Sequence, residues 1–438
     1  MYGFWGFIIL LAGILFQSLL HNTGRIQSDY CLWFFIFVSA YFFINDLSLQ
    51  FPKRMRYVVA SAAVVRFLIM LWNVYGRDIY LLPNVGQDTE GFFYSASMIS
   101  QNLDLLNVNV YGTYYSKYLG IIFHLTGPSY LLGSYLNYVY GLLVIRFVND
   151  IVQSIVSPED TAYIKSMYIF AFAPMSMILF SSLRREAIMI LFAVLSIKML
   201  FQWIEAGKKT FAVLSVVFLL ISSLFHAGMI GIFLGYAFLF LFYNPKSRSI
   251  SFDIKTIVAG VLLSLLVVII VAQYSSLFLQ KLMFANEDAL YYQLATKARG
   301  GAVYLDSVRI TSISDIVLYS PLKIFYFLLS PVPWDWRGLQ DVMAFALDSL
   351  IYLYLIVLLI RRYSNVHYPT KLGLVLAFLG CLEIFAIGSQ NAGTAIRHRC
   401  KLLPLLIVLY CILKTNNYTI TKKADNYKQE EIVYESRL

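Results

Sequence analysis

Apolar runs recur along the whole chain, and they constrain its fold more than any other feature. Runs of about 18 or more residues are each long enough to cross the ~30 Å hydrocarbon core of a bilayer as a helix. Sixty per cent of the residues are hydrophobic and only 13% are charged, which is more apolar surface than a soluble domain of this length can bury. The runs are continuous rather than alternating, which excludes a transmembrane β-barrel. We therefore predict an all-α, polytopic helical membrane protein.

The hydropathy pattern predicts twelve spans, and short basic loops between them predict their direction. The spans are 2–20, 30–49, 56–75, 129–148, 163–181, 186–204, 210–225, 227–243, 254–274, 339–360, 371–389 and 397–414. The first run lacks a basic n-region and a cleavage pattern, so we interpret it as a spanning helix rather than a signal peptide.

The four cysteines lie in or beside apolar runs without metal-ligand spacing, so we expect no metal site.

Clustered basic residues in short loops are expected to face the cytoplasm. Five such clusters agree on one path with both termini inside: 53–56, 208–209, 246–255, 361–371 and 414–423. Residues 1–414 then form a single membrane domain with long external loops at about 76–128 and 275–338, followed by a polar cytoplasmic tail, 415–438. Within the second loop, 317–331 is apolar but short and proline-rich, so we predict a re-entrant or interfacial helix there. Because the basic residues lie beside helix ends, the net charge of +10 does not indicate nucleic-acid binding.

Arg184 and Arg185 lie between two apolar runs, and the predicted path places them outside. The positive-inside bias does not account for external arginines, so an anionic partner becomes the leading explanation; the alternative is that each arginine reaches lipid headgroups. The rigid guanidinium fork suits phosphate oxygens. The same face is predicted to collect further residues that could bind phosphate or sugar: Tyr94, Lys117, Arg299, Arg309, Trp334, Arg397, His398 and Arg399.

Two carboxylates in the first external loop, Asp88 and Glu90, are candidates for a general base that activates a sugar hydroxyl. His226, in a tight turn between two spans, is a further catalytic candidate. Simpler roles are a turn or helix cap for Asp88, a local hydrogen bond for His226 and an interfacial belt position for Trp334. The chain has no phosphate-binding glycine loop followed by Lys-Ser/Thr, so ATP-driven transport has no support.

Several of these motifs carry a family resemblance. Residues 180–190 (FSSLRREAIMI), the basic loop 205–209 and the turn 224–230 (LFHAGMI) resemble the central block of EpsG-like and Wzy-type polysaccharide polymerases. Residues 86–96 are similar to the early external acidic region of those proteins and of the wider GT-C glycosyltransferase class. Residues 393–399 resemble their final basic element.

The resemblance implies a GT-C-like fold and a repeat-unit polymerase. Such enzymes join undecaprenyl-diphosphate-linked oligosaccharides into surface polysaccharide (O-antigen, capsule or exopolysaccharide) at the outer face of the bacterial inner membrane, without cofactor. Membrane lipid, a chain-length regulator and a flippase are the implied partners. The chain departs from the pattern at Glu186, where Gln is common. Alternatives are a glycosyltransferase with a polyprenyl-phosphate sugar donor, an O-antigen ligase and, less favoured, a transporter or flippase.

The same resemblance implies roles for individual residues. The arginines would hold the diphosphate leaving group and stabilise its developing charge. Asp88 or Glu90 would activate the acceptor hydroxyl. Tyr94, Tyr118 and Trp334 would line the path of the sugar chain.

Overall fold

The protein is almost entirely helical in the computed structural model, which describes residues 2–22, 30–252, 301–308, 310, 312–364 and 370–414. The one hairpin in these residues pairs β1 (Tyr243–Asn244) with β2 (Ser249–Ile250) in antiparallel fashion. The predicted all-α membrane class is therefore confirmed. The predicted span 254–274 and the candidate residues Arg299 and Arg309 lie outside the described residues.

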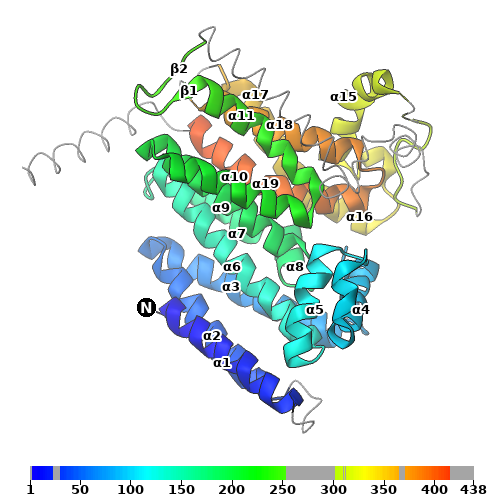
Figure 1. Ribbon diagram of the computed structural model, residues 1–438. Coiled ribbons are helices and arrows are strands. Elements are labelled where there is room, and N and C mark those ends of the chain that lie inside the picture. The colour runs from blue at the N-terminus through cyan, green and yellow to red at the C-terminus, as the bar shows by residue number, and fades with distance from the viewer. Residues whose placement is uncertain are drawn as a thin grey trace, which may run out of the picture.

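The N-terminal half of the chain supplies a peripheral helical layer and one long central helix. Its elements are α1 (Tyr2–Asn22), α2 (Tyr30–Leu49), α3 (Lys53–Leu71), the π-helix η1 (Trp72–Gly76), α4 (Gly86–Gln101), the 3-10 helix η2 (Leu103–Asn107), α5 (Tyr114–Thr126) and α6 (Tyr130–Ile155). Helices α4 and α5 pack on each other and lie at one end of the molecule, whereas the β1–β2 hairpin lies at the other (Figure 1).

The middle of the chain forms helices that bend and turn back on themselves. Its elements are α7 (Thr161–Phe172), α8 (Pro174–Phe180), α9 (Glu186–Ala206), α10 (Lys209–Phe225), the 3-10 helix η3 (Ala227–Ile232) and α11 (Phe233–Phe242). Helices α7 and α8 meet at an angle of 51°, because Pro174 cannot donate to the helical hydrogen-bond ladder. The buried Arg66 of α3 donates to the carbonyl of Ala171 at this bend and to Ser176 Oγ.

The C-terminal part of the described chain brings one helix into the centre of the bundle. Its elements are α15 (Ile313–Leu329), the 3-10 helix η4 (Pro333–Asp335), α16 (Leu339–Ala344), the π-helix η5 (Phe345–Ser349), α17 (Leu350–Arg362), α18 (Lys371–Ile387) and α19 (Ala392–Lys414). Helix α15 lies where the sequence predicts a re-entrant or interfacial helix. It packs against α17, α18 and α19.

Six helices within the described residues are long and apolar enough to cross a membrane, or seven if the bent α7–α8 pair counts as one span. The six are Tyr2–Asn22, Leu32–Leu49, Lys53–Gly76, Tyr130–Ile155, Glu186–Ala206 and Leu339–Arg362. Helices also form at the other described positions predicted as spans. However, α10 and α18 have 17 residues each, and the N-terminal half of α19 is charged. Twelve full spans are therefore not confirmed.

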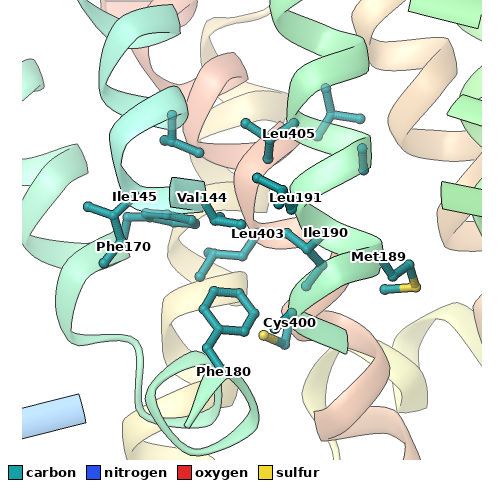
Figure 2. Close-up of a cluster of buried hydrophobic side chains, with 14 of the residues drawn as sticks. Val144, Ile145, Phe170, Phe180, Met189, Ile190, Leu191, Cys400, Leu403 and Leu405 are labelled. Atoms are coloured by element: carbon teal, nitrogen blue, oxygen red, sulfur yellow. The ribbon is translucent and has the colours of Figure 1, made fainter. Parts of the chain in front are cut away.

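Helix α19 is the axis of the core. Every residue from His398 to Leu413 is buried, and the helix packs against α6, α7, α8 and α9 and against α15, α17 and α18. Figure 2 shows this packing, with Ile145 of α6, Phe170 of α7 and Ile190 of α9 around Leu403. Helix α1 is mostly exposed, as expected for a helix that faces lipid. Since lipid tails are as apolar as the core, this packing is held mainly by van der Waals contact and interhelical hydrogen bonds.

Candidate functional site

The turn between α8 and α9 presents the arginine pair, and two buried amides fix its backbone. Asn73 in η1 donates to the carbonyl of Ser181 over 3.1 Å. Asn137 in α6 donates to the carbonyls of Ser182 and Arg184, both over 2.6 Å. Non-helical backbone at membrane depth is tolerated only where protein groups satisfy it. The two asparagines therefore hold the turn in the conformation that aims Arg184 and Arg185.

Arg184 is almost fully buried and joins three elements. Its guanidinium donates to the carbonyl of Asn84 and, over 2.7 Å, to Oδ2 of Asp88 in the first turn of α4. Its Nε lies 3.4 Å from Oε2 of Glu186 at the start of α9. Both carboxylates lie in the first turn of a helix, where the positive end of the helix dipole favours negative charge.

Asp88 is the point where distant segments meet. Its Oδ2 also pairs with Arg397 of α19, and its Oδ1 accepts a hydrogen bond from the Tyr111 hydroxyl. Burial alone would raise the pKa of Asp88, but the charge of Arg397, the Tyr111 hydrogen bond and the charge of Arg184 together hold the pKa below its usual value. Asp88 is therefore ionised at neutral pH, and its low pKa makes it a weaker base in this arrangement than a free carboxylate.

Glu186 forms a second, deeper layer of the same site. It is 1% exposed, and its Oε1 lies 3.8 Å from Arg397 Nε and 3.9 Å from Lys401 Nζ. Arg397 and Lys401 are four residues apart on α19, so they share one face of the helix. The two layers form a single charged network.

Arg185 differs from its neighbours because the described residues place no carboxylate within 4 Å of it. Its guanidinium lies 5.8 Å from the centroid of the Phe92 ring, and its Nε has no hydrogen-bond partner among these residues. Burial lowers the pKa of Arg185, because the charged guanidinium has lost part of its hydration. Within the described part of the chain, no ion pair competes with an anion for the Arg185 side chain.

We call these six residues the arginine cluster: Asp88, Arg184, Arg185, Glu186, Arg397 and Lys401. Four are cationic and two are anionic, so the cluster carries a formal excess of two positive charges. Uncompensated charge in a buried site is unfavourable. The arrangement therefore suits an anionic ligand with two charges, such as a phosphate or diphosphate group.

Arg399 lies two residues from Arg397 but is used differently. It is 0% exposed and pairs with Asp348 of η5 at 2.6 Å. Its Nη1 also donates to the carbonyls of Phe327 and Leu328 at the end of α15, over 3.2 and 2.6 Å. The structure thus commits Arg399, predicted to bind substrate, to contacts inside the protein.

His226 and His398 come together beside the cluster. Their rings lie 5.1 Å apart, and each packs on Phe385, whose ring also lies 5.1 Å from Lys401 Nζ. Nδ1 of His226 accepts from the backbone of Gly228 over 3.2 Å. This local contact is the simpler role that the sequence suggests for His226.

The other site residues predicted in the segment 76–128 contact residues outside the cluster or are exposed. Glu90 pairs with Arg77 at 2.6 Å, although it is only two residues from Asp88. Tyr94 is largely exposed, and the Tyr118 hydroxyl contacts that of Tyr140. Among the described residues, these side chains are not brought into the arginine cluster.

Lys117 and Trp334 are also placed outside the cluster. Nζ of Lys117 lies 5.9 Å from the Tyr114 ring centroid. Trp334 is 65% exposed, and its Nε1 donates to the Tyr326 hydroxyl over 3.1 Å. Both roles given to Trp334 by the sequence, a sugar contact and an interfacial belt position, therefore stay predictions.

Sequence reasoning missed five residues that form or support the site: Asn73, Tyr111, Asn137, Glu186 and Lys401. Two had a local signal, because Glu186 directly follows the arginine pair and Lys401 is one helical turn after Arg397. Tyr111 and the two asparagines had none, because only the tertiary fold brings them to Asp88 and to the turn.

Neither a protein-family model nor a curated protein or solved structure matches this chain. Among the described residues, no group of three or more His, Cys, Asp or Glu side chains is arranged to hold a metal ion. The functional argument therefore rests on the geometry and charge of the arginine cluster.

Proposed function

We propose that this protein is a membrane glycosyltransferase that polymerises oligosaccharide repeat units carried on undecaprenyl diphosphate, and that the arginine cluster binds the diphosphate. The observation that carries the proposal is the formal excess of two positive charges among six described residues at the junction of α4, α9 and α19. Arg185, without a carboxylate partner in the described residues, is the first contact for the ligand.

The chemistry follows from the positions of the charges. The acceptor hydroxyl oxygen attacks the anomeric carbon of the donor chain, and the bond from that carbon to the diphosphate oxygen breaks. The electron pair leaves with the diphosphate, where Arg185 and Arg397 stabilise the new charge. The hydroxyl proton passes to a carboxylate, for which we assign Asp88, the more exposed of the two carboxylates in the cluster. Its low pKa implies that it becomes an effective base only when the ligand draws Arg184 or Arg397 away from it.

The location of the cluster supports a substrate anchored in lipid. The cluster lies where the first turns of α4 and α9 meet the charged N-terminal part of α19, beside helices that can cross the membrane. A polyprenyl carrier can stay in the bilayer while its charged head group enters at this level. The proposal includes the predicted orientation, with the cluster on the external face of a bacterial inner membrane and both termini in the cytoplasm.

The direct test is reconstitution of the full-length protein in liposomes with undecaprenyl-diphosphate-linked repeat units, with the products sized on a gel. We expect a ladder of polymer with the wild-type protein and its loss in Arg185→Ala and Arg397→Ala. Arg337→Ala is the matched control, because Arg337 is an exposed arginine that pairs with Asp341 at 2.8 Å outside the cluster. Full-length polymer from correctly inserted Arg185→Ala and Arg397→Ala proteins would overturn the proposal.

The same assay distinguishes the alternatives by product. Addition of one sugar from a polyprenyl-phosphate donor would indicate a single-sugar transferase. Transfer of a finished chain from its carrier would indicate a ligase. Movement of the lipid-linked unit across the bilayer without a new covalent bond would indicate a transporter or flippase. Each of these results would replace the polymerase assignment.

A further inference from the structure

Asp88 is held from two sides, and the side opposite the arginines is occupied by a tyrosine. Arg184 and Arg397 both contact Oδ2 of Asp88, whereas the Tyr111 hydroxyl donates to Oδ1. We propose that Tyr111 is a positioning residue that holds the Asp88 carboxylate against the two arginines and so controls how readily they accept an anionic ligand. This inference deepens the proposed function, because it concerns regulation of the same anion site.

The backbone beside Tyr111 is in an unusual conformation. Gly112 has φ +79° and Thr113 has φ 46°, so two consecutive residues lie in the left-handed region that favours glycine. A β-carbon on Gly112 would clash with the Phe92 ring and with Ser116 Oγ. Ser116 Oγ donates to the carbonyl of Tyr111 over 2.7 Å. Strained backbone of this kind persists where the surroundings fix it, often at functional sites.

The Tyr111 ring is also packed so that its hydroxyl reaches Asp88. A β-carbon on Gly91 would lie 2.5 Å from Cε1 of Tyr111, so the glycine allows the ring to lie directly on α4. The ring centroid is 5.5 Å from that of Phe92, which in turn lies beneath the guanidinium of Arg185. Tyr111 therefore belongs to the same wall of the site as Arg185.

The charged groups around Asp88 determine how the Tyr111 hydroxyl affects the Asp88 carboxylate. Asp88 faces Arg184 from the α8–α9 turn, Arg397 from α19 and Tyr111 from the α4–α5 loop. Glu186 from α9 acts in the opposite direction, by raising the pKa of Asp88. Burial and the hydrogen bond to Asp88 raise the pKa of Tyr111 to about 12, so the phenol stays protonated and keeps donating at neutral pH.

Loss of the Tyr111 hydroxyl should raise the pKa of Asp88, because the ionised carboxylate loses a donor. Asp88 would then become protonated at a higher pH than in the wild-type protein. A neutral Asp88 competes less well with a ligand for Arg184 and Arg397. Anion binding should therefore strengthen on acidification, and it should do so at higher pH when Tyr111 is replaced.

The test is calorimetric titration of the full-length protein in nanodiscs with inorganic pyrophosphate, across a series of acidic to neutral pH values. We expect wild-type affinity to rise as Asp88 becomes protonated, and the rise to move to higher pH in Tyr111→Phe. Asp88→Asn gives the pH dependence of pyrophosphate itself. Tyr80→Phe is the matched control, because Tyr80 lies in the same external segment and is 51% exposed, as is Tyr111.

Two results would overturn the positioning role. One is a Tyr111→Phe profile that coincides with that of the wild type. The other is loss of pyrophosphate binding at every pH in Tyr111→Phe while Asp88→Asn still binds, which would make Tyr111 a direct ligand contact. Since no sugar is transferred in this experiment, it can succeed even if the polymerase assignment fails, and the polymerisation assay can succeed even if Tyr111 has no such role.

Discussion

Arg397 and Arg399 stand two residues apart on α19, yet their surroundings differ in almost every respect. Arg399 is sealed from solvent, and its charge is matched by Asp348 and two carbonyls. Arg397 shares Asp88 and Glu186 with Arg184, and Glu186 also lies near Lys401, in a cluster that keeps a formal excess of positive charge. Residues two apart on a helix point in different directions. One helix therefore presents a structural arginine, Arg399, to one side and an arginine of the proposed ligand site, Arg397, to the other.

The strongest test of this comparison is removal of the structural arginine. Arg399→Ala leaves Asp348 buried without its cation, and breaking a buried pair in this way costs about 3–5 kcal/mol of stability. We expect a large fall in the yield of folded protein and in the unfolding temperature, measured by fluorescence-detected gel filtration after heating.

A double variant provides the control for that experiment. Arg399→Met combined with Asp348→Leu removes both charges, and it should recover much of the lost stability because no isolated charge remains. If Arg399→Ala alone is as stable as the wild type, the structural role assigned to this pair is wrong.

The opposite behaviour is expected of Arg185, the cation of the cluster without a carboxylate partner in the described residues. Arg185→Ala should leave the unfolding temperature unchanged or slightly higher, because like charges repel within the cluster. Pyrophosphate affinity should fall by about 10- to 100-fold, the scale of a lost charge-assisted hydrogen bond. Arg185→Lys separates the effect of charge from that of the guanidinium fork. A destabilised Arg185→Ala protein with intact anion binding would reverse the comparison.

A smaller effect is expected from the amides that support the arginine turn. Asn137→Leu removes the donor for two carbonyls, those of Ser182 and Arg184, and each unsatisfied buried group costs about 1–3 kcal/mol. Asn73→Leu removes the donor for only one, Ser181. Thermal unfolding should rank Asn137→Leu below Asn73→Leu, and equal or inverted values would show that the turn is held by other contacts.

The smallest effect is the pH dependence that Asp88 gives to stability. Its pKa in the folded protein is depressed, so its ion pairs stabilise the fold above the usual aspartate pKa of ~3.9. This contribution is lost as the pH falls through the lower pKa of the folded state. The stability difference between the wild type and Asp88→Asn should therefore shrink on acidification below that window. A difference that grows with acid would contradict the assigned sign.

The positions of the helices could be read from the sequence because a continuous apolar run is a local signal. The junction between two apolar runs at the arginine pair, and the gathering of Arg184, Arg397 and Asp88 on one face, also follow from local pattern and predicted topology. Asp88 and Arg397 do meet, although 309 residues separate them.

The sequence did not predict which of two similar residues joins the arginine cluster and which pairs elsewhere. Asp88 and Glu90 look equivalent in the sequence, but the structure pairs Glu90 with Arg77, outside the cluster. Arg397 and Arg399 look equivalent too, until the rotation of α19 against η5 and α15 separates them. These outcomes depend on which neighbours face each side of a helix, and that information lies in residues distant along the chain.

The bend between α7 and α8 has a consequence for how the sequence can change. Proline at position 174 interrupts the helix, and Arg66 supplies a donor to the Ala171 carbonyl at the break. Pro174 thus breaks the helix and Arg66 satisfies a carbonyl at the break, although 108 positions separate the two residues in the sequence. In descendants of this chain the two positions should change together. Where the proline is replaced and the helix is continuous, the Ala171 carbonyl is satisfied within the helix, and a buried arginine at position 66 is no longer needed.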